Sequence, residues 1–232
     1  MPDEVQYATP PDTGVARIPA LLVSGLFHPL LVPTYIFLLL VGVDPYLFGT
    51  SDLGEPRAMS NLILIFLDTF VIPVVAVLLM VKLNMIGSIM MEEKSERIGP
   101  LLLVMVLYFW IFYNFSQSSQ TPTLFTSFLL GVIIALIACF VINLLDKISL
   151  HATGMGGLLA VSIILWGFYD SGGILVGSLE IGLPLIVVAA AVMSGVVGSA
   201  RLALSSHDPM QLYAGYMVGF VAQFAALKFY TE

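Results

Sequence analysis

Residues 121–145 read TPTLFTSFLLGVIIALIACFVINLL and contain no aspartate, glutamate, lysine or arginine. A helix needs about 20 mostly apolar residues to cross the hydrocarbon core of a bilayer, so this stretch is long enough to do so. The whole chain shares this character, because 59% of its 232 residues are hydrophobic and only 10% are charged. Soluble domains contain about 25% charged residues. The sequence therefore predicts an integral membrane protein.

The same length rule predicts seven transmembrane helices along the chain. They are expected at about residues 18–43, 60–82, 98–115, 121–145, 151–168, 176–200 and 209–228. The connectors between them are short and carry most of the charge, so none is long enough to form a second domain. We therefore predict an all-α bundle in a single domain, residues 18–232, which follows a short polar tail, residues 1–17.

Charge and cysteine content limit the partners of the chain. Its formal net charge is −7 and it has no basic run, which argues against a nucleic-acid partner. The first residues are acidic and rich in proline, so no signal peptide is expected. Cys139 is the sole cysteine and forms no internal disulfide. The expected partners are membrane lipids, no cofactor is expected, and the sequence leaves a homo-oligomer open.

Seven spans would put the two termini on opposite sides of the membrane and would sort the connectors between its faces. Six of the eight basic residues fall on the N-terminal face, which the positive-inside rule would make cytoplasmic. Three of these six are candidate site residues, and without them the count is three against two, so orientation stays open. The residues that share this face include Lys94, Arg97, His151, Arg201 and His207.

The residues on this shared face suit the transfer of a phosphoryl group. Histidine is rare in and near membrane spans unless it has a function. Guanidinium groups neutralise phosphate oxygens through paired hydrogen bonds. One histidine could supply the nucleophile and the other the acid that protonates the leaving group. No metal is required when cationic side chains surround the phosphoryl group.

The sequence around these residues resembles the type 2 phosphatidic acid phosphatase superfamily of membrane lipid phosphatases, with the family spacing kept in Arg201-x5-His207. That family carries the blocks Lys-x6-Arg-Pro, Pro-Ser-Gly-His and Ser-Arg-x5-His-x3-Asp. The resemblance covers about residues 94–219, and only the third block is specific by itself. The matching residues are Lys94 and Arg97 for the first block, Ser149 and His151 for the second, and Arg201, His207 and Gln211 for the third.

The resemblance implies a role for each matched residue in a metal-independent phosphomonoesterase or diphosphatase. His207 would attack phosphorus to form a phosphohistidine, and His151 would protonate the leaving group. The substrate would be a phospholipid or an isoprenyl phosphate or diphosphate, in the bacterial cytoplasmic membrane. The side chains that would hold the phosphoryl oxygens are Arg201, Arg97, Lys94 and Ser149.

The first two blocks depart from the family pattern in spacing and in residue type, and the departure that matters most lies in the third block. The family aspartate that follows the nucleophile by four residues, and orients its imidazole, is Gln211 here. A glutamine carbonyl at i+4 can accept from the imidazole N–H, but it carries no charge. Neutralising the analogous carboxylate of a serine-protease triad costs about 10⁴ in rate. Asp208 could substitute for the missing carboxylate or cap the helix that starts at Pro209.

Other interpretations stay open on the sequence alone. Gln211 and the altered first and second blocks favour a weakened or inactive homologue that binds or moves phospholipids. Lys94 and Arg97 could belong to a solvated charged loop. Asp68 is an intramembrane carboxylate, expected toward the face opposite the histidines. It favours either a hydrogen bond to a neighbouring helix or a small transporter built around it.

Three further residue patterns carry structural predictions. His28, which precedes Pro29, is expected to be a satisfied polar residue at a turn perturbed by the proline. Small residues four or fewer positions apart let helices approach closely. Close-packing helix surfaces are therefore predicted at Gly195-x2-Gly198 and Gly215-x3-Gly219.

Overall fold

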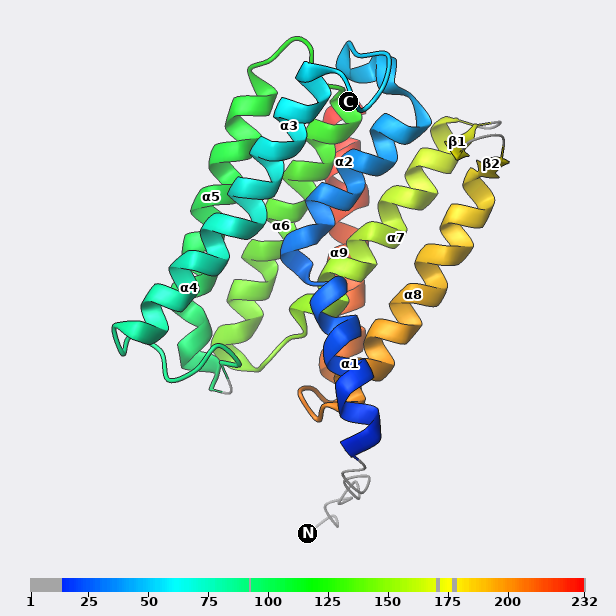
Figure 1. Cartoon of the computed structure of the whole chain (residues 1–232). Helices are drawn as coiled ribbons and strands as arrows, with labels where there is room; N and C mark the ends of the chain where they lie inside the picture. The colour runs from blue at the N-terminus through cyan, green and yellow to red at the C-terminus, as the bar shows by residue number, and fades with distance from the viewer. Residues whose placement is uncertain (1–13, 92, 170–171, 177–178, 232) are drawn as a thin grey trace.

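The computed structural model describes residues 14–91, 93–169, 172–176 and 179–231, and it confirms an all-α membrane bundle (Figure 1). Within these residues, seven helical segments are long and apolar enough to cross a membrane. The chain is therefore an integral membrane protein. Most of the predicted polar tail lies outside the described residues, and the first helix already begins at Gly14. The seven segments are Arg17–Val43, Pro56–Lys82, Lys94–Ser116, Thr123–Leu145, Leu150–Phe168, Leu183–Ala203 and Pro209–Tyr230.

The first span is broken in two at a proline. Pro29 has no N–H with which to continue a helix, so the helix ends before it. The Nδ1 atom of His28 accepts a hydrogen bond from the Leu30 N–H at 3.3 Å and caps the turn that follows. This confirms the prediction for His28. The segments are α1 (Gly14–Leu26), the 3-10 turn η1 (Pro29–Leu31) and α2 (Val32–Val43).

The second span contains a wide π-helical turn. The turn directly precedes Pro73, whose missing N–H breaks the regular hydrogen-bond ladder. Phe70 in this turn contacts the ring of His28, with centroids 6.2 Å apart. The turn therefore lies at the level of His28, and the membrane face nearer to Asp68 stays a prediction. The segments are α3 (Pro56–Phe66), η3 (Leu67–Val71) and α4 (Ile72–Lys82).

The carboxylate of Asp68 is half-buried in this turn. Among the described residues it makes no hydrogen bond to a neighbouring helix, so the predicted hydrogen bond of Asp68 is not found there. The wider π-turn shifts the face on which each side chain of the helix lies, which periodicity alone does not reveal.

The other helices lie close to their predicted ranges, with one exception. Residues expected to begin the sixth span instead form an antiparallel hairpin, in which Gly173 pairs with Gly182. The sixth transmembrane helix therefore begins at Leu183, because Gly182 caps it and Pro184 suits its first turn. The elements are η2 (Pro45–Phe48), η4 (Lys94–Arg97), α5 (Ile98–Ser116), α6 (Thr123–Leu145), α7 (Leu150–Phe168), β1 (Gly173–Val176), β2 (Leu179–Gly182), α8 (Leu183–Ala203) and α9 (Pro209–Thr231).

The helix α7 packs against both α8 and α9, and α9 also packs against α6 (Figure 1). Glycines bring these helices close together. A Cβ at Gly219 would overlap the Thr153 carbonyl oxygen, and one at Gly215 would lie 2.6 Å from the Ser149 carbonyl oxygen. Gly198 similarly faces the hydroxyl of Tyr216, so close packing at these three glycines is confirmed. The last glycine of the prediction, at position 195, meets no atom within 4 Å, so close packing there is wrong.

We predict that Gly219→Ala lowers the thermal unfolding midpoint of the detergent-purified protein, whereas Gly195→Ala does not. The added methyl group at position 219 has no space against α7, and such overpacking costs about 1–3 kcal/mol. At position 195 the same change meets open space and gains helix propensity. Equal midpoints for the two variants would contradict this account of the α7–α9 contact.

Candidate functional site

His207 lies in the turn between α8 and α9 and is only 9% exposed. Its Nδ1 atom is 2.9 Å from Oε1 of Gln211. An amide oxygen can only accept a hydrogen bond, so Nδ1 carries the proton and Nε2 keeps its lone pair. The amide group of Gln211 is oriented by its own NH₂, which donates to Oδ1 of Asp146 at 3.5 Å. This arrangement leaves the imidazole as a neutral base with Nε2 available.

Both backbone polar groups of Gln211 also form hydrogen bonds. Its N–H donates to Oδ1 of Asp208 at 2.8 Å, and its carbonyl oxygen accepts from the Ser149 N–H at 3.3 Å. Asp208 therefore caps the first turn of α9, which confirms one of the two roles predicted for it. The bond from Ser149 ties the connector between α6 and α7 to the start of α9. Every polar group of Gln211 thus has a partner.

Two arginines place positive charge near His207. Arg97 donates from Nε to the Met91 carbonyl oxygen at 3.1 Å and from Nη1 to the Ile148 carbonyl oxygen at 3.3 Å. Arg201 donates from Nη1 to the Ser24 hydroxyl at 3.3 Å, while its Nε atom is buried and has no partner among the residues that the structure describes. Within the described part of the chain, neither guanidinium pairs with a carboxylate. These two groups therefore retain positive charge that an anion can neutralise.

The surroundings of His207 favour its neutral form. Burial is the largest cause that lowers the pKa of His207 to about 4. The hydrogen bond with Gln211 acts in the opposite direction, and the positive charges of Arg97, Arg201 and Lys147 lower the pKa further. The imidazole is therefore unprotonated at Nε2 near neutral pH, as a nucleophile must be.

His151 lies at the first turn of α7, where it meets the break in the first span. Its Nε2 atom is 3.0 Å from the carbonyl oxygen of Ser24, so Nε2 carries a proton in this contact. Its ring packs edge-on against His28, with centroids 5.4 Å apart. Ser24 also accepts from Arg201 through its hydroxyl. The first span thus joins the site, although no motif in the sequence pointed to Ser24.

Ser149 and Lys94 make contacts typical of helix ends. Ser149 is fully buried, and its hydroxyl accepts from the Ala152 N–H at 3.4 Å to cap α7. Lys94 donates from Nζ to the carbonyl oxygens of Leu144 and Leu145 at the end of α6, at 3.4 and 2.9 Å. Phosphate binding by either residue therefore stays a prediction.

Arg97, in contrast, does not lie in a solvated charged loop. It is half-buried, and its two backbone contacts join the segment before α5 to the connector between α6 and α7. Together with the contacts of Arg201, this brings four of the predicted site residues to one end of the bundle. They are His151, His207, Arg97 and Arg201, which act on one another electrostatically.

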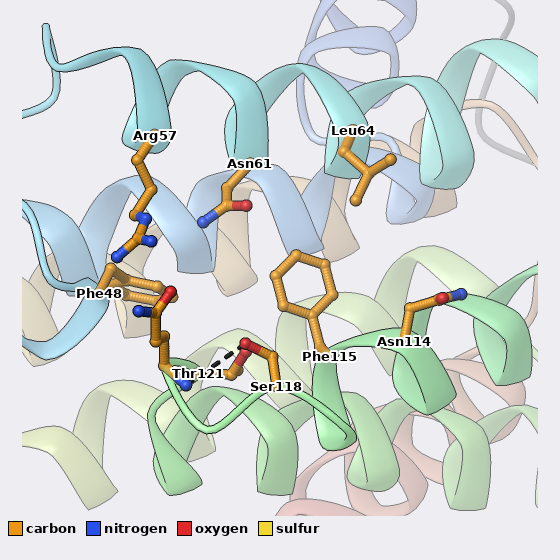
Figure 2. A pocket seen from close by; sticks show the side chains of 9 residues that line it. Phe48, Arg57, Asn61, Leu64, Asn114, Phe115, Ser118 and Thr121 are labelled. Carbon is orange, nitrogen blue, oxygen red and sulfur yellow. Dashed lines mark hydrogen bonds between the residues drawn. The ribbon is translucent and has the colours of Figure 1, made fainter.

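A cavity of about 190 Å³ lies elsewhere in the bundle, between α3 and the turn that joins α5 to α6 (Figure 2). Arg57 and Asn61 of α3 face the rings of Phe48 and Phe115 across it, as Figure 2 shows. None of the predicted site residues lines this cavity. By the order of the spans it belongs to the opposite membrane face, which makes Arg57 a useful control position.

Comparison with known proteins leaves the family of the chain unassigned: no family model matches it, and neither a curated protein nor a solved structure matches it. The resemblance to lipid phosphatases therefore rests on the sequence motifs quoted above.

We predict that acid destabilises the folded protein through His207. The pKa of this residue is lowered from 6.5 to about 4 by folding, so the unfolded chain binds a proton that the folded chain does not. Stability should therefore fall as the pH decreases from about 6.5 toward 4. Thermal unfolding midpoints of wild type and His207→Gln, measured across this range, should converge at low pH. Parallel curves would show that His207 is not buried in its neutral form.

Proposed function

We propose that the protein is a membrane lipid phosphatase or diphosphatase that works through a phosphohistidine on His207. The observation that carries this proposal is the imidazole of His207, held by Gln211 beside the guanidinium groups of Arg97 and Arg201. Among the described residues, Nε2 of this imidazole makes no hydrogen bond and neither guanidinium pairs with a carboxylate. The Nε atom of Arg201 is buried and has no partner there either, which fits a hydrogen bond to a phosphoryl oxygen. The resemblance to lipid phosphatases supports the same assignment.

In the proposed first step, the lone pair on Nε2 of His207 attacks phosphorus. A P–N bond forms while the P–O bond to the lipid breaks, and the leaving oxygen takes a proton. Positive charge develops on the imidazole, and Gln211 stabilises it by accepting from Nδ1. Arg97 and Arg201 would neutralise the phosphoryl oxygens as charge shifts between them. Water then attacks phosphorus, the P–N bond breaks and phosphate leaves.

His151 is the proposed acid for the leaving oxygen. Its Nε2 proton is donated to the Ser24 carbonyl oxygen. The proton for the leaving oxygen therefore comes from Nδ1 of the doubly protonated ring, and the neutral imidazole remains after the transfer. Substrates that fit are lipids whose phosphate lies at the membrane surface, such as phosphatidic acid, phosphatidylglycerol phosphate and isoprenyl diphosphates. The proposed location is the bacterial cytoplasmic membrane.

A second candidate is a protein that binds or moves phospholipids without turnover. The observation that favours it is the contact of His151 with Ser24, because this contact occupies Nε2. The uncharged Gln211, which stands where the family has a carboxylate, also favours binding without turnover. Both candidates use Arg97 and Arg201 to recognise a phosphate, and they differ in whether a P–O bond breaks.

We predict that the purified protein releases phosphate from at least one lipid phosphate or diphosphate in a panel of such lipids. His207→Ala should reduce release by at least about 10³-fold, since it removes the nucleophile. Arg201→Lys should cost about tenfold or more, because a lysine replaces a two-pronged donor with a point charge. Phosphate assays on the detergent-purified variants measure both effects.

The matched control is Arg57→Lys, which makes the same change at the cavity in Figure 2 and should leave release unchanged. Absence of release from every lipid would overturn the phosphatase proposal. Phospholipid binding that persists in wild type but weakens in Arg201→Lys would then favour the second candidate.

A further inference from the structure

The side chain of Gln211 contacts a hydrogen-bond donor on one side and a hydrogen-bond acceptor on the other. Its carbonyl oxygen faces Nδ1 of His207 at 2.9 Å, and its NH₂ faces Oδ1 of Asp146 at 3.5 Å. Asp146 follows α6 directly, and the same Oδ1 accepts from the Lys147 N–H at 2.6 Å. The bond from the Ser149 N–H to the Gln211 carbonyl oxygen holds this connector against α9. The carboxylate is exposed, and one backbone N–H, that of Lys147, holds it at the end of α6.

We propose that Asp146 is a positioning residue, whose negative charge acts on His207 through the amide of Gln211. This inference rests on the proposed function, in which His207 becomes positively charged. A carboxylate that accepts from an amide NH₂ polarises the amide and makes its oxygen a stronger acceptor. Gln211 would thus transmit part of the stabilisation that a carboxylate in direct contact with the imidazole would give.

The arrangement also accounts for an amide at position 211. An aspartate or glutamate there would place a second negative charge close to Asp146, and like charges at this distance repel. Glutamine instead donates to Asp146 and accepts from His207, so both contacts are favourable. The amide and the carboxylate together replace a single acidic residue.

Several charged groups act on His207 besides this pair, and the test must separate them. The positive groups are Arg97 before α5, Arg201 at the end of α8 and Lys147 in the connector. His151 of α7 also interacts with it electrostatically, and Asp208 is its neighbour in sequence. Among the charged groups of the described residues, only Asp146 contacts the side chain of Gln211, so changes confined to Asp146 and Gln211 isolate its contribution.

The first test is a titration of His207 in the full-length protein in detergent, followed by NMR of labelled histidine and assigned with His207→Gln. Asp146→Asn should lower the pKa of His207 by about 0.5 to 1 unit, because a stabilising negative charge is lost. The double variant Asp146→Asn with Gln211→Glu exchanges the amide and the carboxylate at nearly constant size. It should raise the pKa above that of wild type, because the charge then contacts Nδ1 directly.

The matched control is Glu180→Gln, which removes an exposed carboxylate from β2 at the other end of the bundle and should leave the titration of His207 unchanged. An unchanged titration in Asp146→Asn, with an unfolding midpoint like that of wild type, overturns the inference. If the double variant does not fold, the single variant decides by itself.

The second test is the hydrolysis of a lipid phosphate by the same variants. Asp146→Asn should lower kcat about threefold to tenfold with KM unchanged, a smaller loss than for a carboxylate in direct contact. The double variant should restore kcat at least in part. A shifted titration without any hydrolysis would support the link from Asp146 to His207 and overturn the proposed function. Hydrolysis that is lost in His207→Ala but unchanged in Asp146→Asn would support the proposed function and overturn the link from Asp146 to His207.

Discussion

The helix α9 approaches α7 so closely that a methyl group at Gly215 or Gly219 would overlap atoms of Ser149 or Thr153. This contact brings the first turn of α9 against the connector that precedes α7. Gln211 then accepts from the Ser149 N–H through its backbone, and its side chain lies between His207 and Asp146. The position and the tautomer of His207 follow from these bonds, so the chemistry of the site depends on how two helices pack.

The charge of the site is unusual for a membrane protein. Arg97 and Arg201 lie at spans whose other residues are mostly apolar, and a charge in such surroundings is costly unless it is paired. Within the described residues their hydrogen bonds go to carbonyl oxygens and one hydroxyl, none of which carries a charge. A phosphate group would supply the missing negative charge. Burial is the main cause that keeps His207 neutral, and the same positive charges act in that direction by lowering its pKa further.

Much of this could be predicted from the sequence, because the relevant signals are local. Hydropathy located the spans. Arg201, His207 and Gln211 lie within one short stretch, in which the i to i+4 spacing of His207 and Gln211 fixes the contact between these two. Ser24 and Asp146 escaped prediction because they join the site only through tertiary packing. Hydropathy also could not distinguish the hairpin before α8 from the start of a helix, since a short apolar run suits either structure.

A covalent bond between His207 and phosphorus can be detected by phosphorus NMR of the protein under alkaline, denaturing conditions. The protein would be quenched during turnover of a lipid phosphate, and the modified peptide would be located by mass spectrometry. The account predicts a phosphoramidate on His207 in wild type. Phosphate release without a phosphorylated histidine, or with the phosphoryl group on a residue other than His207, would contradict the proposed mechanism.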